Sequence, residues 1–285
     1  METSATARRL ARRFVAGETL DDALAVARKL NEEGITVTLD HLGESVANLE
    51  EAAAARDVYL RTLEAIHEKG IQGNVSLKLT QFGLDLAYEH ALANVDQLVR
   101  RAAELDSFVR VDMEASAHTS ATLGLVHDLF GRHGHVGVVI QAYLFRSEKD
   151  VEELNTSRIR VRLCKGAYLE PPDVAFPDKK DVDRNFIKIA ENLLQHGTYP
   201  AIASHDEAIL RHMKQFVEKH GIDRDSFEFQ MLYGIRRDLQ RQLVAQGWRL
   251  RLYVPFGRAW YPYYMRRLAE RPANVLFILR NLFRH

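Results

Sequence analysis

The chain has 285 residues, of which 46% are hydrophobic and 27% are charged, which is ordinary for a folded globular protein. Its 39 Lys and Arg residues balance its 39 Asp and Glu residues, and this net neutrality counts against a nucleic-acid partner and against a disordered chain. The single cysteine, Cys164, excludes an internal disulfide and a multi-cysteine metal centre. We therefore expect no metal site and a reducing, cytoplasmic location.

No apolar run approaches the roughly 18 residues that are needed to cross a bilayer. The N-terminus carries Arg8, Arg9, Arg12 and Arg13 without the apolar core of a signal peptide, and we interpret residues 1–34 as a helical arm. A solvated helix face explains these arginines most simply. Peripheral contact with anionic lipid, at the inner face of the cell membrane, is the alternative.

From residue 35 onward, short β-rich runs alternate with longer segments of helical periodicity. The predicted strands are 35–39, 74–79, 108–113, 136–141, 159–163, 199–203, 226–231 and 249–253. The predicted helices that follow them are 48–68, 88–105, 120–133, 148–154, 181–196, 206–219, 236–245 and 259–270.

Strands that are joined by helical crossovers run parallel, and eight such units in about 250 residues favour a closed barrel over an open sheet. No G-x-G-x-x-G motif follows a strand, which counts against an open dinucleotide-binding sheet. We predict an α/β fold, a single-domain (βα)8 TIM-type barrel over residues 35–285. An extra C-terminal helix, apolar over residues 274–283, is expected to cap it; contact with another subunit or with lipid is the alternative.

Reactive groups of such a barrel lie at the carboxyl ends of its strands. Polar residues occupy these ends in all eight predicted units, namely Asp40, Glu44, Lys78, Asp112, Glu114, Gln141, Arg162, Lys165, His205, Gln230 and Tyr253. Buried charges are costly unless they are paired or bound to a ligand. Pairing inside the barrel, for example of Lys78 with Asp112, explains any one of them equally well, but their density at one rim favours a site.

The last predicted helix carries Tyr263, Arg266, Arg267 and Glu270 along one face. Two guanidinium groups can fix both the position and the orientation of a small carboxylate. The alternative is a solvent-facing helix in which Glu270 offsets the two arginines.

Two further segments suit an anionic cofactor. Arg162, Lys165 and Gly166 place two cations and a glycine at the end of one strand, where a ligand can approach the backbone closely. Ser204 and His205 open a helix directly after another strand, where first-turn amides favour phosphate. A simple N-cap by Ser204 or Asp206 is the alternative for the second segment.

Taken in order, these motifs resemble the proline dehydrogenase family, flavoenzymes that carry FAD on a barrel. The matching motifs are LGE (42–44), VSLKL (75–79), VDME (111–114), VIQAY (139–143), RLCKGAY (162–168), SH (204–205), FEFQ (227–230), YVP (253–255) and YYMRRLAE (263–270). The resemblance implies oxidation of L-proline to pyrroline-5-carboxylate by hydride transfer to FAD, the first step of proline catabolism. Electrons would pass to a membrane quinone. The chain resembles the monofunctional form, so a separate aldehyde dehydrogenase would process the product.

The resemblance also implies a role for each matching residue. Arg266 and Arg267 would bind the proline carboxylate with help from Lys78, and Glu44 would act as a gate by pairing with Arg266. The substrate pocket would be shaped by Asp112, Leu163, Tyr253 and Tyr263. The FAD contacts would be Gln141, Arg162, Lys165, Gly166, Ala167, Leu169, Ser204, His205 and Glu270. Family members often have Trp where this chain has Leu169, and Thr where it has Ser204.

Two other readings compete with this one. A Schiff-base aldolase would use a deprotonated lysine at a barrel strand end, either Lys78 or Lys165. A non-enzymatic protein would bind an acidic partner or RNA through its arginines, which the neutral net charge disfavours.

Overall fold

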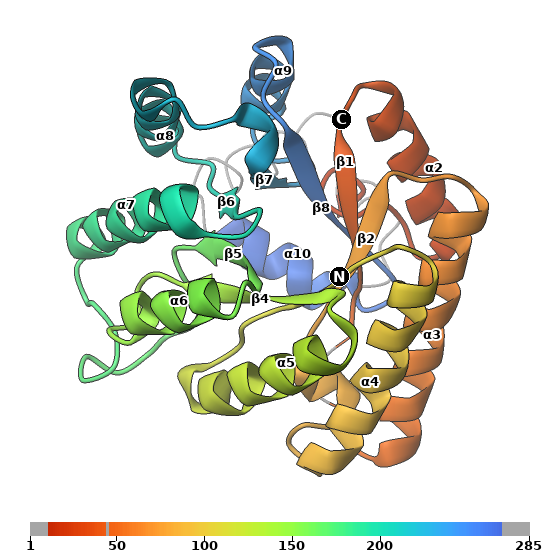
Figure 1. Ribbon diagram of the computed structural model, residues 1–285. Coiled ribbons are helices and arrows are strands. Elements are labelled where there is room, and N and C mark those ends of the chain that lie inside the picture. The colour runs from red at the N-terminus through yellow and green to blue at the C-terminus, as the bar shows by residue number, and fades with distance from the viewer. Residues whose placement is uncertain (1–10, 44–45, 270–285) are drawn as a thin grey trace.

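The sheet is a closed barrel of eight strands, ordered β1 to β8 around the ring, in a computed structural model that describes residues 11–43 and 46–269 (Figure 1). Every neighbouring pair is parallel, including β8 with β1, which closes the ring. The strands are β1 (Thr36–His41), β2 (Gly73–Leu77), β3 (Val109–Val111), β4 (Val136–Gln141), β5 (Arg160–Cys164), β6 (Ala201–Ala203), β7 (Glu228–Leu232) and β8 (Leu250–Phe256). The predicted TIM-type barrel is therefore confirmed.

Helices surround this barrel, and the predicted helix after each strand is present (Figure 1). They are α2 (Leu20–Glu32), α3 (Leu49–Glu68), α4 (Tyr88–Glu104), α5 (Thr119–His133), α6 (Ser147–Thr156), α7 (Lys179–His196), α8 (Glu207–His220), α9 (Arg237–Ala245) and α10 (Trp260–Ala269). The sequence reading missed three short 3-10 helices in the loops, at Leu79–Phe82, Ser116–His118 and Arg224–Ser226. Such single turns carry too little periodicity to be recognised.

Burial explains why strand β4 has a nearly continuous apolar sequence. All six residues of β4 are buried, because one face of a barrel strand meets the helices and the other meets the barrel interior. The helices are amphipathic and turn one stripe inward; α4, for example, buries Val95, Leu98 and Ala102. One main hydrophobic cluster results, running through the strands and the inner faces of the helices.

Helix α2 belongs to this packing. Thr19 caps it through a reciprocal capping box with Asp22, and its buried residues Ala23, Leu24 and Ala27 join the main core. The α2 part of the predicted arm thus lies against the barrel, contacting β1 and β8.

Helix α10 and the segment before α2 pack together at the carboxyl end of β8. Phe14 lies against Tyr264, with ring centroids 6.1 Å apart, in a small cluster that also contains Leu42 and Trp260. The amide of Ala16 donates to the carbonyl of Pro255 over 2.9 Å. In Figure 1, α10 crosses the middle of the ring of helices. The predicted apolar cap, residues 274–283, lies outside the described residues.

None of the helices in the described part of the chain combines the length and the apolarity that crossing a bilayer requires.

Candidate active site

Four polar side chains meet at the carboxyl end of the barrel, two from strands and two from the residues directly after strands: Arg162 of β5, Tyr253 of β8, Lys78 after β2 and Asp112 after β3, here called the Asp112 cluster. The Nζ atom of Lys78 lies 3.3 Å from Oδ2 of Asp112 and 3.3 Å from the hydroxyl of Tyr253. That hydroxyl also donates to Oδ2 of Asp112 over 2.9 Å. The predicted pairing of Lys78 with Asp112 is therefore present.

Arg162 completes the cluster from β5. Its guanidinium group donates to Asp112, to Oγ of Ser76 over 3.2 Å and to Oε1 of Gln230 over 3.4 Å. Its Cζ atom lies 5.2 Å from the centroid of the Tyr253 ring. Only 8% of the Arg162 side chain is exposed, so its charge depends on the Asp112 carboxylate for compensation.

Electrostatics keep this cluster ionised. Burial opposes ionisation of Asp112, but Arg162 and Lys78 outweigh it and hold the pKa of Asp112 below its ordinary value. Burial would likewise lower the pKa of Lys78, but nearby carboxylates, chiefly Asp40 and then Asp112, raise it above its ordinary value. Burial, followed by the charge of Asp112, raises the pKa of the Tyr253 hydroxyl. Lys78 is thus an ammonium group, which disfavours the aldolase reading because a Schiff-base lysine reacts as a free amine.

The second carboxylate beside Lys78 is Asp40 of β1, to which the sequence reading gave a place at the rim but no role. Its Oδ1 atom lies 3.6 Å from Nζ of Lys78 and accepts a hydrogen bond from the hydroxyl of Tyr59 over 3.2 Å. Sequence analysis also missed Tyr59, which comes from α3, and Tyr168, which acts electrostatically on Lys78. Tyr59 offered no signal, because it appeared as an ordinary apolar position of a helix.

A second group of predicted residues lies where β4 and β5 end. The side chain of Gln141 donates to the carbonyl of Glu114 over 2.8 Å and accepts from the amide of Ala167 over 3.2 Å. Gly166 has φ of 128°, and a Cβ there would collide with the ring of Tyr143. The Gln141 contacts fix the backbone of the loop after β5, and only glycine fits at position 166, because its φ is positive and the Tyr143 ring fills the space that a Cβ would need.

The third group of predicted residues joins Lys165, which directly follows β5, to the loop after β6. Lys165 forms ion pairs with Asp183 over 2.5 Å and with Asp206 over 3.1 Å. Asp206 is also the N-cap of α8, where it accepts from the amide of Ala208 over 3.1 Å. The simple N-cap alternative is therefore correct for Asp206. Ser204 is buried, and Nε2 of His205 accepts a hydrogen bond from the amide of Leu232 over 2.9 Å.

The remaining predicted residues make none of the hydrogen bonds or ion pairs described above for the Asp112 cluster. Leu163 is fully buried in the main core and follows Arg162 in β5, so alternation places it on the opposite face of the strand. Leu169 is fully exposed. Tyr263 is buried in α10, with Cζ of Arg267 lying 5.1 Å from its ring centroid. Glu44, Glu270 and the side chain of Arg266 lie outside the described residues.

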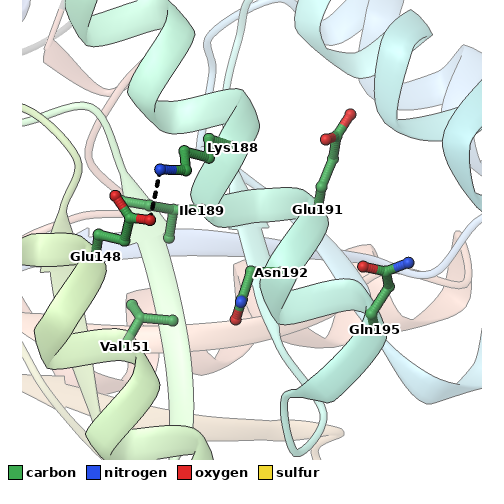
Figure 2. A pocket seen from close by; sticks show the side chains of 7 residues that line it. All are labelled: Glu148, Val151, Lys188, Ile189, Glu191, Asn192 and Gln195. Atoms are coloured by element: carbon green, nitrogen blue, oxygen red, sulfur yellow. Dashed lines mark ion pairs between the residues drawn. The ribbon is translucent and has the colours of Figure 1, made fainter.

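A cavity of about 170 Å³ lies elsewhere, on the outer surface between α6 and α7 (Figure 2). An ion pair of 2.5 Å between Lys188 and Glu148 spans it, and Asn192 and Val151 are among its other lining residues. All of its lining residues belong to α6 and α7, and none comes from a strand end. The barrel mouth, with its buried charges, remains the candidate active site.

The chain is similar to known proteins over nearly its whole length. The model of a family described as proline dehydrogenase matches residues 23–280. A proline dehydrogenase of Deinococcus radiodurans is 42% identical over 280 residues, which cover 96% of this chain and 90% of the relative. Proline dehydrogenase 1 of Bacillus subtilis is 41% identical over 274 residues, covering 96% of this chain and 91% of the relative.

Solved structures show the same architecture. Proline utilization A of Bdellovibrio bacteriovorus, described as inactivated by N-propargylglycine, superposes with a TM-score of 0.87 at 28% identity. The match covers 92% of this chain and 32% of that longer chain.

Proposed function

This chain belongs to the proline dehydrogenase family, and from that premise we propose that it oxidises L-proline to pyrroline-5-carboxylate at the barrel mouth, as the first step of proline catabolism. The observation that carries the proposal is the Asp112 cluster: an ammonium group, a guanidinium group and a phenol held around one carboxylate at the carboxyl ends of the strands. Active sites of TIM barrels lie at this end.

We propose FAD as the cofactor. The side chains at the ends of β4, β5 and β6 fit it, because they offer amide, guanidinium, ammonium and hydroxyl groups beside a glycine at positive φ. The residues that would hold it are Gln141, Arg162, Lys165, Gly166, Ala167, Leu169, Ser204, His205 and Glu270. Bound FAD would supply the redox chemistry by accepting a hydride.

The protein's own side chains would bind and orient the substrate. Lys78, Arg266 and Arg267 would hold the carboxylate of proline, which fixes the ring and the carbon that reacts. Leu163, Tyr253 and Tyr263 would shape the pocket, and Glu44 would close it by pairing with Arg266.

Hydride loss from the carbon beside the ring nitrogen requires a free lone pair on that nitrogen. Asp40 and Asp112 already pair with Lys78 and Arg162, so the neighbouring positive charge that lowers the pKa of the secondary amine would come mainly from Arg266 and Arg267. The substrate would therefore lose its ammonium proton more readily in the site than in water, with solvent as the acceptor. We propose that the electrons then reach a membrane quinone and that a separate aldehyde dehydrogenase consumes the product.

An absorbance spectrum of the purified protein tests this function directly. We expect an oxidised flavin band near about 450 nm that is bleached by anaerobic addition of L-proline. A colourless protein that borohydride inactivates in the presence of a carbonyl substrate would be an aldolase instead. A flavoprotein whose band L-proline leaves unchanged would exclude proline as the substrate.

A further inference from the structure

Asp40 is a buried carboxylate of β1 that has no role in the proposed reaction. It is 1% exposed, and within residues 11–43 and 46–269 its one ion pair is the 3.6 Å contact with Lys78. Its Oδ2 atom is buried and has no hydrogen-bond partner in the same described region. A buried charge is costly unless a counter-charge offsets it, so its presence in β1 calls for an explanation.

Asp112 cannot serve Lys78 alone, because it is shared. Its Oδ1 atom accepts hydrogen bonds from Arg162 and from the hydroxyl of Ser76. Its Oδ2 atom accepts a hydrogen bond from the hydroxyl of Tyr253 and forms the ion pair with Lys78. Arg162 is the more deeply buried of the two cations, with 8% of its side chain exposed against 25% for Lys78. The larger desolvation cost falls on Arg162, so Asp112 serves mainly that guanidinium group.

The four charges therefore divide into two pairs. Arg162 of β5 pairs with Asp112, which follows β3. Lys78, which follows β2, lies between Asp112 and Asp40, the carboxylate of the neighbouring strand β1. Asp40 is itself held by the hydroxyl of Tyr59, which reaches it from α3 and also accepts the amide of His41 over 3.1 Å. The position of the Lys78 ammonium group is thus set from two sides.

We propose that Asp40 is a positioning residue, which holds the Lys78 ammonium group in place for the substrate carboxylate while Asp112 serves Arg162. This role rests on the proposed function, in which Lys78 binds the carboxylate group of proline. Asp40 itself does not touch that ligand. Its loss should weaken carboxylate binding through Lys78 and leave flavin content unchanged.

A double-mutant cycle separates this role from a structural one. The probe is tetrahydrofuran-2-carboxylate, which has the ring and the carboxylate of proline but no oxidisable amine, and its binding to the purified holoenzyme is measured by titration calorimetry. Asp40→Asn should weaken binding by about tenfold or more, the range of a lost interaction with a charged group. In the Lys78→Met background the same change should leave binding unchanged or tighten it, because it then removes an unpaired buried charge.

Controls keep the result interpretable. Asp150→Asn removes another buried carboxylate that pairs with an arginine, on the outer helix α6, and should leave probe binding unchanged. Asp40→Glu, which keeps the charge, should bind more tightly than Asp40→Asn. If Asp40→Asn does not fold, Tyr59→Phe removes the hydrogen bond that holds Asp40, and we expect it to weaken binding only while Lys78 is present.

An equal loss of affinity in both backgrounds would overturn the proposal, because Asp40 would then act on the fold and not through Lys78. Unchanged binding in Asp40→Asn would overturn it as well. Failure of the proposed function is distinguishable: the unmodified enzyme would then neither oxidise L-proline nor bind the probe. An unmodified enzyme that does both, with a cycle that is additive, rejects the role of Asp40 alone.

Discussion

Replacing Asp112 with Asn should destabilise the protein strongly. The carboxylate offsets Arg162, whose side chain is 8% exposed, and also meets Lys78. An amide offers one oxygen and a donor NH₂ group, so it cannot replace both acceptor oxygens, and the NH₂ group would face a hydrogen-bond donor. Breaking a buried ion pair by removing one partner costs about 3–5 kcal/mol, because the other charge stays buried without compensation.

The free energy of unfolding, measured by urea titration in saturating FAD, checks this magnitude. Asp150→Asn is the matched control: it also breaks an arginine–carboxylate pair, but Arg146 is 42% exposed and can be solvated. A pair whose partners are both exposed contributes about 0–1 kcal/mol, and because Arg146 can be solvated we expect the loss in this control to lie nearer to that range than to the cost of a buried pair. Equal losses in the two variants, or a loss below about 1 kcal/mol in Asp112→Asn, would refute the argument that burial of Arg162 sets the cost.

The pH dependence of the same measurement has a definite sign. Arg162 and Lys78 hold the folded pKa of Asp112 below the unfolded value of about 3.9. The stability that Asp112 contributes is therefore complete above that value and is lost as the pH falls through it towards the folded pKa. The difference between the unmodified protein and Asp112→Asn should be largest at neutral pH and should shrink in acid. A difference that grows in acid would contradict the assignment.

Three further outcomes follow from the site. Gly166→Ala should lower the free energy of unfolding by about 1–3 kcal/mol and should lower the flavin-to-protein ratio, because its φ is 128° and the new Cβ would meet the Tyr143 ring. Gly131→Ala is the control: no atom lies within 4 Å of its new Cβ, so it should change neither quantity. Lys78→Met should raise the KM for L-proline at unchanged flavin content, with a cost of about 2–5 kcal/mol in kcat/KM that steady-state kinetics would reveal. Burial raises the pKa of Cys164 to about 11, so its thiol should react with iodoacetamide at pH 8 far more slowly in the folded than in the urea-unfolded protein.

The fold could be predicted from sequence because parallel barrels repeat one local pattern. Strand β4 is a nearly continuous apolar run that ends at Gln141, and from residue 35 onward such short β-rich segments alternate with amphipathic helices. The ends were less certain: β8 extends to Phe256, three residues beyond the predicted end. It pairs along its length with β1, a partner more than 200 positions away that local sequence cannot reveal.

The site was predictable in its composition and in one pairing, that of Lys78 with Asp112, but not in its other pairings. Polar residues at strand ends identified Lys78, Asp112 and Arg162 together. The stagger of the strands decides which of them meet, and it places Arg162 of β5 against Asp112, which follows β3, while Asp40 of β1 lies beside Lys78. No one-dimensional pattern encodes that choice.

This pairing carries a consequence for substrate charge. The cations Lys78 and Arg162 are balanced one for one by Asp40 and Asp112, so these four groups bring no net charge to the barrel mouth. An anionic substrate entering there would find fixed dipoles and directed donors but no surplus positive charge from them. The surplus has to come from outside the strands. Helix α10, which packs against the rim beside Leu42, carries the neighbouring pair Arg266 and Arg267. The strand charges would then set the geometry of binding, and α10 would set its charge.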